Sequence, residues 1–166
     1  MSDYLLPAEL VERARKVVEA NRAAGRRVAV AESCTGGLVS AAITEIAGSS
    51  DMFEAGYVTY SNEAKQAELN VASDVVETFG AVSIATAWAM AQGALEASGA
   101  DVAVAITGIA GPDGGSPHKP VGTVVFARAR REDGGEPEGE QREFAGASRS
   151  EVRRQATLVA LELLLP

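Results

Sequence analysis

The chain has 166 residues, one domain's worth, and a formal net charge of −8, which argues against non-specific nucleic-acid binding through a basic surface. No apolar run is long enough to cross a membrane, and the start lacks a basic segment followed by an apolar one, so we expect a cytoplasmic protein without membrane attachment. The single cysteine excludes an internal disulfide, and no metal-ligand set is apparent, so we expect neither metal nor cofactor.

Hydrophobic periodicity and turn residues predict one domain, residues 1–166, without internal repeats or an interdomain linker. In chain order, the pattern predicts a helix over 7–24, a strand over 27–32, a helix over 36–47, a strand over 54–60, helices over 62–69, 73–80 and 83–98, a strand over 101–107, a loop over 108–122, a strand over 123–130, a polar turn over 131–139, a strand over 141–144 and a last helix opened by Ser148. Serines at 61, 73, 83 and 148 are the expected caps of their helices. This order indicates an α/β fold with helices on both faces of a mixed sheet.

The segment 28–37 runs from an apolar strand through Ser33 and Cys34 into Gly36 and Gly37, where a helix is expected to begin. A side chain at such a junction faces free backbone N–H groups and the positive end of a helix dipole. The loop 108–122 leaves a second apolar strand, and ligands of open α/β sheets collect at such strand ends. We therefore look for a nucleophile and its substrate here.

If Ser33 is a nucleophile, it needs a base within hydrogen-bond reach. The only histidine, His118, lies between Pro117 and Lys119 in the expected loop, which disfavours a Ser-His-Asp arrangement. Lys65 follows a strand end that should lie near Ser33, whereas Lys16 belongs to the solvent face of the first helix. A lysine base must be neutral, which burial favours. Elimination therefore selects Ser33 and Lys65, with the hydroxyl of Tyr60, or of Tyr57, as a proton relay.

Simpler interpretations of the same residues stay open. Ser33 could serve only as a helix cap, and Lys65 could be a solvated surface lysine. Cys34 is either a buried small apolar residue or the true nucleophile, and the lack of a histidine partner favours the first. Glu32 could orient a donor at the strand end or be an ordinary exposed acid.

The loop from Thr107 onward contains glycines that could wrap a phosphate or an aromatic ring, or could simply make a long connection. It has neither a Walker lysine nor the spacing of a dinucleotide fingerprint. Small groups of arginines could bind a phosphate or form solvated faces; they comprise Arg26 and Arg27, then Arg128, Arg130 and Arg131, then Arg149, Arg153 and Arg154.

Long motifs, in order along nearly the whole chain, resemble the C-terminal domain family of the competence/damage-inducible protein CinA. They are Ala31-Glu32-Ser33-Cys34-Thr35-Gly36-Gly37, Tyr57-Val58-Thr59-Tyr60-Ser61-Asn62-Glu63-Ala64-Lys65, Gly80-Ala81-Val82-Ser83, Thr107-Gly108-Ile109-Ala110-Gly111-Pro112-Asp113-Gly114-Gly115, Lys119-Pro120-Val121-Gly122-Thr123-Val124 and Val152-Arg153-Arg154-Gln155-Ala156.

The resemblance implies a three-layer α/β/α sandwich with a mixed, mostly parallel central sheet. It also implies a cofactor-free amidase that converts nicotinamide mononucleotide and water to nicotinate mononucleotide and ammonia. Ser33 would be the nucleophile, Lys65 its base and Tyr60 a supporting hydroxyl. The residues expected around the substrate are Thr35, Gly36, Gly37, Thr107, Gly108, Gly111, Arg149 and Arg153.

One departure from the family pattern concerns Arg149. The segment 144–149 is one residue longer than in relatives and lacks an acid before this arginine, so its contact with a phosphate stays open, while Arg153 is unaffected. The alternative function is a non-catalytic nucleotide-binding or interaction module associated with competence or DNA damage. The alanine-rich helix that follows Ser83 has a face wide enough for a homodimer.

Overall fold

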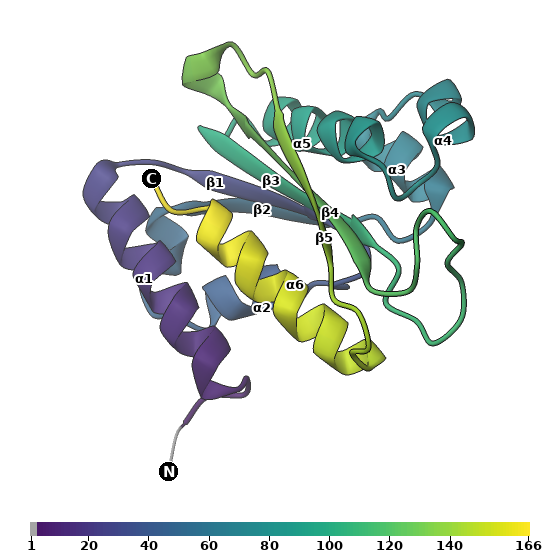
Figure 1. Ribbon diagram of the computed structural model, residues 1–166. Helices are drawn as coiled ribbons and strands as arrows, with labels where there is room; N and C mark the ends of the chain where they lie inside the picture. Colours follow the sequence, from purple (N-terminus) through teal and green to yellow (C-terminus); the bar gives the residue numbers. More distant parts are fainter. Residues whose placement is uncertain (1–2) are drawn as a thin grey trace.

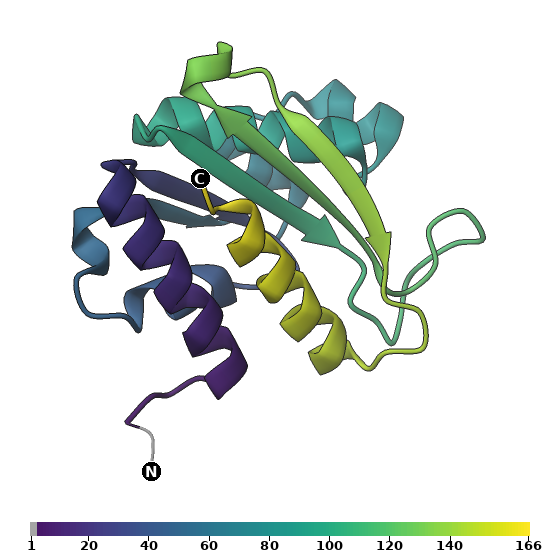
Figure 2. The same cartoon turned by 60° about the vertical axis from the view of Figure 1, so that its left-hand side comes forward.

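The computed structural model describes residues 3–166 and places a five-stranded sheet between two layers of helices (Figures 1 and 2). The strands are β1 (Val28–Glu32), β2 (Phe53–Val58), β3 (Val102–Gly108), β4 (Thr123–Arg130) and β5 (Glu138–Glu143). The helices are α1 (Ala8–Ala24), α2 (Leu38–Thr44), α3 (Asn62–Leu69), α4 (Ser73–Phe79), α5 (Ile84–Ser98) and α6 (Arg149–Leu163), with short 3₁₀ turns at Ser49–Asp51 and Arg131–Asp133. The expected three-layer α/β architecture is confirmed.

The sheet has the order β2-β1-β3-β4-β5 and is mixed, as expected. β1 pairs in parallel with β2 and with β3, while β4 pairs antiparallel with β3 and with β5. β4 therefore runs against the other four strands. Every residue of β1 is buried, which is typical of an interior strand without polar alternation. Because β1 and β3 are parallel neighbours, their carboxyl ends open side by side.

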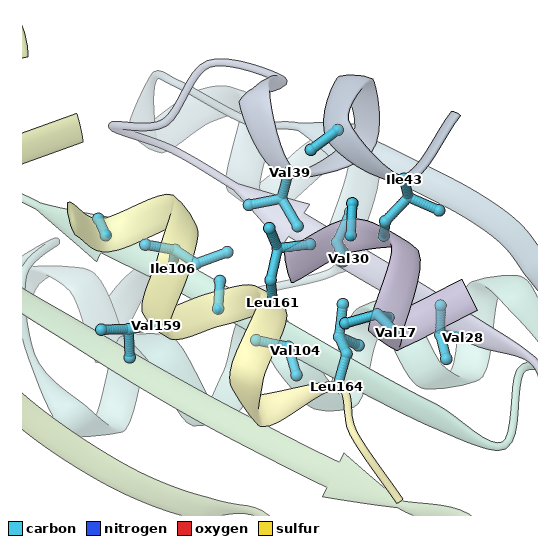
Figure 3. Packing of buried hydrophobic residues seen from close by; sticks show 14 of the residues in the cluster. Val17, Val28, Val30, Val39, Ile43, Val104, Ile106, Val159, Leu161 and Leu164 are labelled. Atoms are coloured by element: carbon cyan, nitrogen blue, oxygen red, sulfur yellow. The ribbon is translucent and has the colours of Figure 1, made fainter. Parts of the chain in front are cut away.

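The two faces of the sheet differ because β1 and β3 alternate valine or isoleucine with alanine. The larger side chains, including Val28, Val30, Val104 and Ile106, pack against α1, α2 and α6 (Figure 3). The alanines of the same strands face α3, α4 and α5, where alanines of α5 meet them. Small side chains on both partners let α5 approach the sheet closely. Of the helices within residues 3–166, none has the length and apolar character that a bilayer span requires.

Three of the four predicted serine caps are confirmed. Ser61, Ser83 and Ser148 each accept a hydrogen bond from the backbone N–H three residues later, as predicted for helix caps. The expected cap at Ser73 is wrong, since α4 begins at this residue and Ala72 occupies the cap position without a side-chain bond.

Several strands and helices begin or end at other residues than predicted. β2 ends at Val58, so Tyr60 lies in the connection to α3 and not in the strand. β5 begins at Glu138, within the predicted polar turn, because this mostly exposed edge strand needs no apolar alternation. The helix predicted over 36–47 is shorter, as α2 spans Leu38–Thr44.

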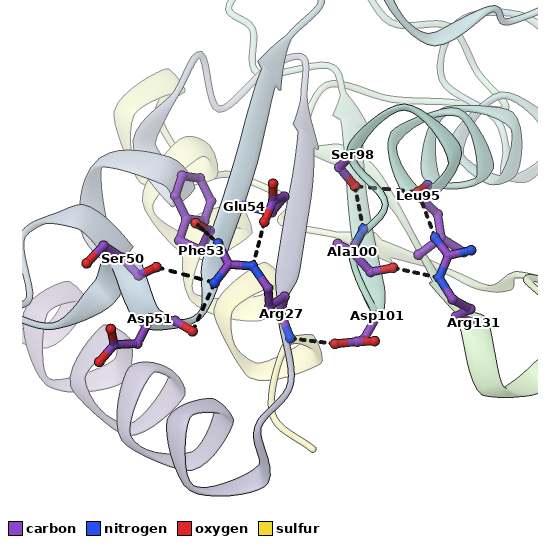
Figure 4. Close-up of polar contacts among 10 residues, drawn as sticks. All are labelled: Arg27, Ser50, Asp51, Phe53, Glu54, Leu95, Ser98, Ala100, Asp101 and Arg131. Atoms are coloured by element: carbon purple, nitrogen blue, oxygen red, sulfur yellow. Dashed lines mark hydrogen bonds and ion pairs between the residues drawn. The ribbon is translucent and has the colours of Figure 1, made fainter.

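Two of the arginine groups hold together the end of the sheet where β1 and β3 begin (Figure 4). Arg27 pairs with Glu54 on β2, and its backbone N–H donates to Asp101, just before β3. The Arg27 guanidinium also donates to the carbonyls of Ser50, Asp51 and Phe53. Arg131 donates to the carbonyls of Leu95 and Ala100 at the carboxyl end of α5. These cations tie the turn before β2 and the carboxyl end of α5 to the neighbouring strands, and their charge suits the negative end of the α5 dipole.

A buried carboxylate joins β1 to α2. Glu32 is fully buried at the end of β1. Its Oε1 accepts hydrogen bonds from Thr35 Oγ1 at 2.7 Å and from the N–H groups of Gly37 and Val39 at 3.2 and 3.0 Å. Its Oε2 accepts from the N–H and hydroxyl of Ser40 at 3.1 and 2.8 Å. Gly37, at the cap position, has φ 103° and no side chain to offer, so Glu32 caps α2 and balances the positive end of its dipole.

Glu32→Gln tests this junction. The amide group of glutamine would face donors whichever way it is turned, so we expect the free energy of unfolding to fall by about 3 kcal/mol in urea denaturation. Glu54→Gln on the neighbouring strand, which breaks the half-exposed pair with Arg27, is the matched control and should cost less than about 1 kcal/mol. Equal losses in the two variants would contradict the capping role of Glu32.

Candidate active site

Ser33 and Lys65 meet in the structure, although 32 positions separate them in the chain. Ser33 follows β1 and is held in line with the sheet by its N–H, which donates to the carbonyl of Ile106 on β3 at 2.9 Å. Lys65 lies on α3 with only 1% of its surface exposed. The Nζ atom of Lys65 is 3.0 Å from the Oγ atom of Ser33.

The other neighbours of the Lys65 amine are two backbone carbonyls. Nζ lies 2.8 Å from the oxygen of Thr59 and 3.1 Å from that of Tyr60. An ammonium group would donate to both carbonyls and to the Ser33 hydroxyl. A neutral amine would donate its two N–H groups to the carbonyls and turn its lone pair toward the hydroxyl. Burial lowers the pKa of Lys65 below its ordinary value, which favours the neutral form.

A cavity of about 200 Å³ opens over this pair. Six segments contribute to it: the ends of β1 and β3 with the residues that follow them, the connection before α3, α3 itself, the connection before α5, and the first residue of α6. The lining residues are Ser33, Cys34, Tyr60, Lys65, Ala81, Val82, Thr107, Gly108, Ala110 and Arg149. The cavity therefore lies at the carboxyl ends of parallel strands, where α/β sheets bind ligands.

Thr107 and Gly108, both expected at the site, form its floor at the end of β3. The Thr107 hydroxyl is not free, since it donates to the carbonyl of Ala81 at 2.9 Å and so ties the loop before α5 to the sheet. A Cβ atom on Gly108 would lie 2.9 Å from a methyl group of Val124 and 3.1 Å from the Sγ atom of Cys34. Only glycine leaves room for these neighbours.

Tyr60 contacts the Lys65 amine through a different atom from the one expected. Its backbone carbonyl, and not its hydroxyl, contacts the Lys65 amine. The Tyr60 side chain is 62% exposed, and its hydroxyl accepts a hydrogen bond from Arg149 Nη2 at 3.2 Å. Arg149 Nη1 donates to the carbonyl of Gly111 at 2.6 Å, which is how Gly111, although it does not line the cavity, joins the site. Arg149 thus connects two loops across the cavity mouth.

Thr35, Gly36 and Gly37 lie beneath the cavity and do not line it. The Thr35 hydroxyl and the Gly37 N–H both donate to Glu32, and the Gly36 N–H donates to the carbonyl of Ser33 at 3.0 Å. The N–H groups of both glycines, expected to face substrate, are therefore engaged within the protein. They shape the turn that carries Ser33.

Arg153 also lies outside the cavity lining, in contrast to Arg149. Its Nε donates to the carbonyl of Cys34 at 3.0 Å, and its Nη2 donates to the carbonyl of Thr35 at 3.4 Å. A Cβ atom on Gly36 would lie 3.3 Å from Nη2, so glycine allows the guanidinium to lie against the turn. The structure brings Arg149, not Arg153, to the substrate side.

Cys34 and His118 are poorly suited to catalysis. Burial raises the pKa of the Cys34 thiol to about 11, which keeps it protonated at neutral pH. His118 is exposed in the loop between β3 and β4 and does not line the cavity. Among residues 3–166, no three histidine, cysteine, aspartate or glutamate side chains gather into a metal-binding group.

A larger cavity, of about 540 Å³, lies at the opposite end of the sheet. It is lined in part by Arg26, Arg130 and Arg131, but these side chains are bonded to protein carbonyls and carboxylates. Their arrangement stabilises the ends of α5, α6 and β4 and offers no nucleophile. The smaller cavity, which contains Ser33 and Lys65, is therefore the candidate active site.

Sequence reasoning missed contributors that carry no distinctive side-chain chemistry. Ala81, Val82 and Ala110 give the cavity its apolar wall, and the Thr59 carbonyl holds the Lys65 amine. The signal that the sequence offered for these residues was their position inside the motifs that resemble the CinA family. Nothing in their side chains predicts a lining or a backbone role.

Comparison with known proteins agrees with this geometry. Residues 11–166 match the CinA C-terminal domain family. Nicotinamide-nucleotide amidohydrolase PncC of Escherichia coli K12 is 51% identical over 157 residues, which cover 95% of this chain and 93% of the relative. A putative competence-damage inducible protein of Symbiobacterium thermophilum is 51% identical over 145 residues, covering 84% of this chain and 34% of that longer protein.

Among solved structures, competence/damage inducible protein CihA from Agrobacterium tumefaciens superposes with a TM-score of 0.92 at 46% identity, covering 99% of this chain and 97% of that one. The matched family segment covers nearly all of the chain, including the Ser33–Lys65 site. The protein is therefore a member of the CinA C-terminal domain family.

Proposed function

We propose that this protein hydrolyses the carboxamide of nicotinamide mononucleotide to give nicotinate mononucleotide and ammonia, with Ser33 as nucleophile and Lys65 as its base. The observation that carries the proposal is the 3.0 Å contact between Lys65 Nζ and Ser33 Oγ inside a cavity. The name of the Escherichia coli relative, a nicotinamide-nucleotide amidohydrolase, supports the substrate.

In the first half-reaction, the neutral Lys65 amine takes the Ser33 hydroxyl proton as Oγ attacks the carboxamide carbon. The carbonyls of Thr59 and Tyr60 hold the two N–H groups of the amine and so aim its lone pair at Ser33. When the tetrahedral intermediate collapses, the carbon–nitrogen bond breaks, and the Lys65 ammonium returns its proton to the leaving nitrogen as ammonia departs.

In the second half-reaction, water attacks the ester that joins Ser33 to the pyridine carbonyl. Lys65 accepts the proton of this water, and the Ser33 oxygen leaves and regains a proton from Lys65. The product carboxylic acid gives its proton to the solvent or to ammonia and becomes the carboxylate, and the original enzyme is regenerated without a cofactor or a metal.

The cavity also fits the two ends of the proposed substrate. Ala81, Val82 and Ala110 offer an apolar wall to the pyridine ring. Arg149 stands at the mouth, where its guanidinium would face the phosphate. Binding energy from such a remote charged group helps to place the amide at the nucleophile.

We further place the protein in the cytoplasm, in pyridine-nucleotide salvage, with a small-molecule substrate and no nucleic-acid partner. The net charge of −8 supports the last point, because a duplex phosphate backbone would be repelled. A homodimer through the alanine-rich α5 is part of the same proposal.

Replacing each of the two neighbouring candidate nucleophiles tests the assignment. Ser33→Ala should lower kcat for ammonia release from nicotinamide mononucleotide by about 10⁴-fold or more, since the attacking oxygen is lost. Cys34→Ala should stay within about tenfold of the unaltered enzyme, because its buried thiol is protonated and takes no part. A coupled ammonia assay measures both.

The opposite pattern, with Cys34→Ala inactive and Ser33→Ala active, would move the attack to the thiol. No ammonia release from the unaltered protein, with nucleotide binding still detected by calorimetry, would favour the non-catalytic nucleotide-binding module.

The lowered pKa of Lys65 predicts the pH dependence of the reaction. Below this pKa the amine is protonated and cannot accept the Ser33 proton, so kcat/KM should rise with pH and level off above it. The midpoint should lie clearly below the ordinary lysine value of 10.5. Lys65→Met should remove the activity, whereas Lys16→Met, on the exposed side of α1, should keep both rate and profile. A midpoint at the ordinary lysine value would contradict the neutral-amine mechanism.

A further inference from the structure

The two peptide groups that follow Ser33 differ from the rest of the turn. The N–H groups of Gly36 and Gly37 are engaged within the protein. Among residues 3–166, the N–H groups of Cys34 and Thr35 donate to no other residue. Of these two residues only Cys34 lines the cavity, whereas Thr35 is fully buried, so the Cys34 N–H is the backbone donor of this turn that a ligand of Ser33 could use.

The carbonyl sides of these peptides are occupied. The Ser33 carbonyl, on the peptide that carries the Cys34 N–H, accepts from Gly36 N–H at 3.0 Å. The Cys34 carbonyl, on the peptide that carries the Thr35 N–H, accepts from Arg153 Nε at 3.0 Å. In a planar trans peptide the carbonyl and N–H point in opposite directions, so a bond that fixes one also fixes the other.

We infer that Arg153 is a positioning residue: it holds the peptide between Cys34 and Thr35, and with it the turn in which the Cys34 N–H stabilises the oxyanion formed at Ser33. A charge-assisted hydrogen bond from a guanidinium holds a carbonyl more firmly than a neutral donor does. The inference builds on the proposed function, because it assigns the oxyanion donor of that reaction.

This assignment replaces the phosphate contact expected of Arg153. Two of its nitrogens donate to carbonyls of the nucleophile turn, and it does not line the cavity. Arg149, one turn earlier on α6, lines the cavity mouth instead. The same helix thus supplies one arginine to the substrate side and another to the back of the turn.

The first experiment separates positioning from phosphate binding by using two substrates. Arg153→Leu should lower kcat by about 30-fold or more, approaching the roughly 100-fold cost of a lost oxyanion donor, because the donor is displaced and not removed. The loss should be the same for nicotinamide mononucleotide and for its nucleoside without phosphate, with KM little changed. A phosphate contact would instead raise KM for the mononucleotide alone. Arg153→Lys keeps the charge but cannot span both carbonyls, so its kcat should lie between those of Arg153→Leu and the unaltered protein.

The second experiment does not depend on the natural substrate. In the reaction with a fluorophosphonate, Ser33 Oγ bonds to phosphorus, fluoride leaves, and the hydroxyl proton passes to Lys65. The phosphoryl oxygen then needs the same backbone donor as the oxyanion of the amide reaction. Mass spectrometry should show Ser33 labelled in the unaltered protein and at least about tenfold slower labelling in Arg153→Leu. Ser33→Ala should give no label at this position.

The matched control is Arg154→Leu, which removes a neighbouring arginine that pairs with Glu151 and Glu9 away from the turn. It should label at the rate of the unaltered protein, and thermal unfolding should show that both leucine variants are folded. Equal labelling of the Arg153 and Arg154 variants, or no labelling of Ser33 in the unaltered protein, would overturn the inference. Slow labelling of Arg153→Leu without any hydrolysis of the mononucleotide would uphold it and remove only the proposed substrate.

Discussion

The site depends on one buried carboxylate, Glu32, which accepts five hydrogen bonds where β1 gives way to α2. A helix N-terminus normally offers its N–H groups to an external anion. Here the protein fills that position with its own side chain, so Gly37, Val39 and Ser40 have no N–H left for substrate. The carboxylate fixes the turn and takes no hydrogen bond from the N–H of Cys34, the residue that follows Ser33 and lines the cavity. The junction is therefore rigid where the nucleophile is attached and open where charge would develop in the proposed reaction.

The site also depends on the buried Lys65 amine, whose hydrogen-bond partners include two backbone carbonyls. Taking an ammonium group out of water is costly unless it is paired, and Nζ contacts no carboxylate. Two carbonyls and one hydroxyl surround it instead, which a neutral amine can satisfy with its two N–H groups and its lone pair, and burial lowers the pKa of Lys65 toward that form. The Ser61 cap fixes the start of α3 and thereby sets the reach of Lys65 toward the strand end. Local helix capping thereby helps to place the amine beside Ser33.

The two ends of the sheet differ in what their polar side chains contact. Where β1 and β3 begin, arginines are bonded to carbonyls and carboxylates and stabilise helix ends. Where these strands end, the cavity holds a serine, a buried amine and one arginine at its mouth. The alternation of larger side chains with alanine along β1 and β3 supports this arrangement, because the alanine face lets α5 pack closely and bring Ala81 and Val82 to the cavity. The larger cavity at the other end shows that volume alone does not identify a site.

The sequence by itself determined the α/β architecture, three of the four serine caps and the choice of Ser33 with Lys65, because these depend on local pattern and on the scarcity of other bases. It did not determine which atom of Tyr60 meets the amine, or which of Arg149 and Arg153 faces the cavity. Tertiary structure decided these points, because two arginines four positions apart on a helix differ only in what their side chains meet across it. The role of Glu32 was likewise open in the sequence, since the number of donors around a carboxylate is fixed only when strand, turn and helix come together. Hydrogen-bond partners are a property of the folded chain, and here they separate the residues that support the turn from those that face the cavity.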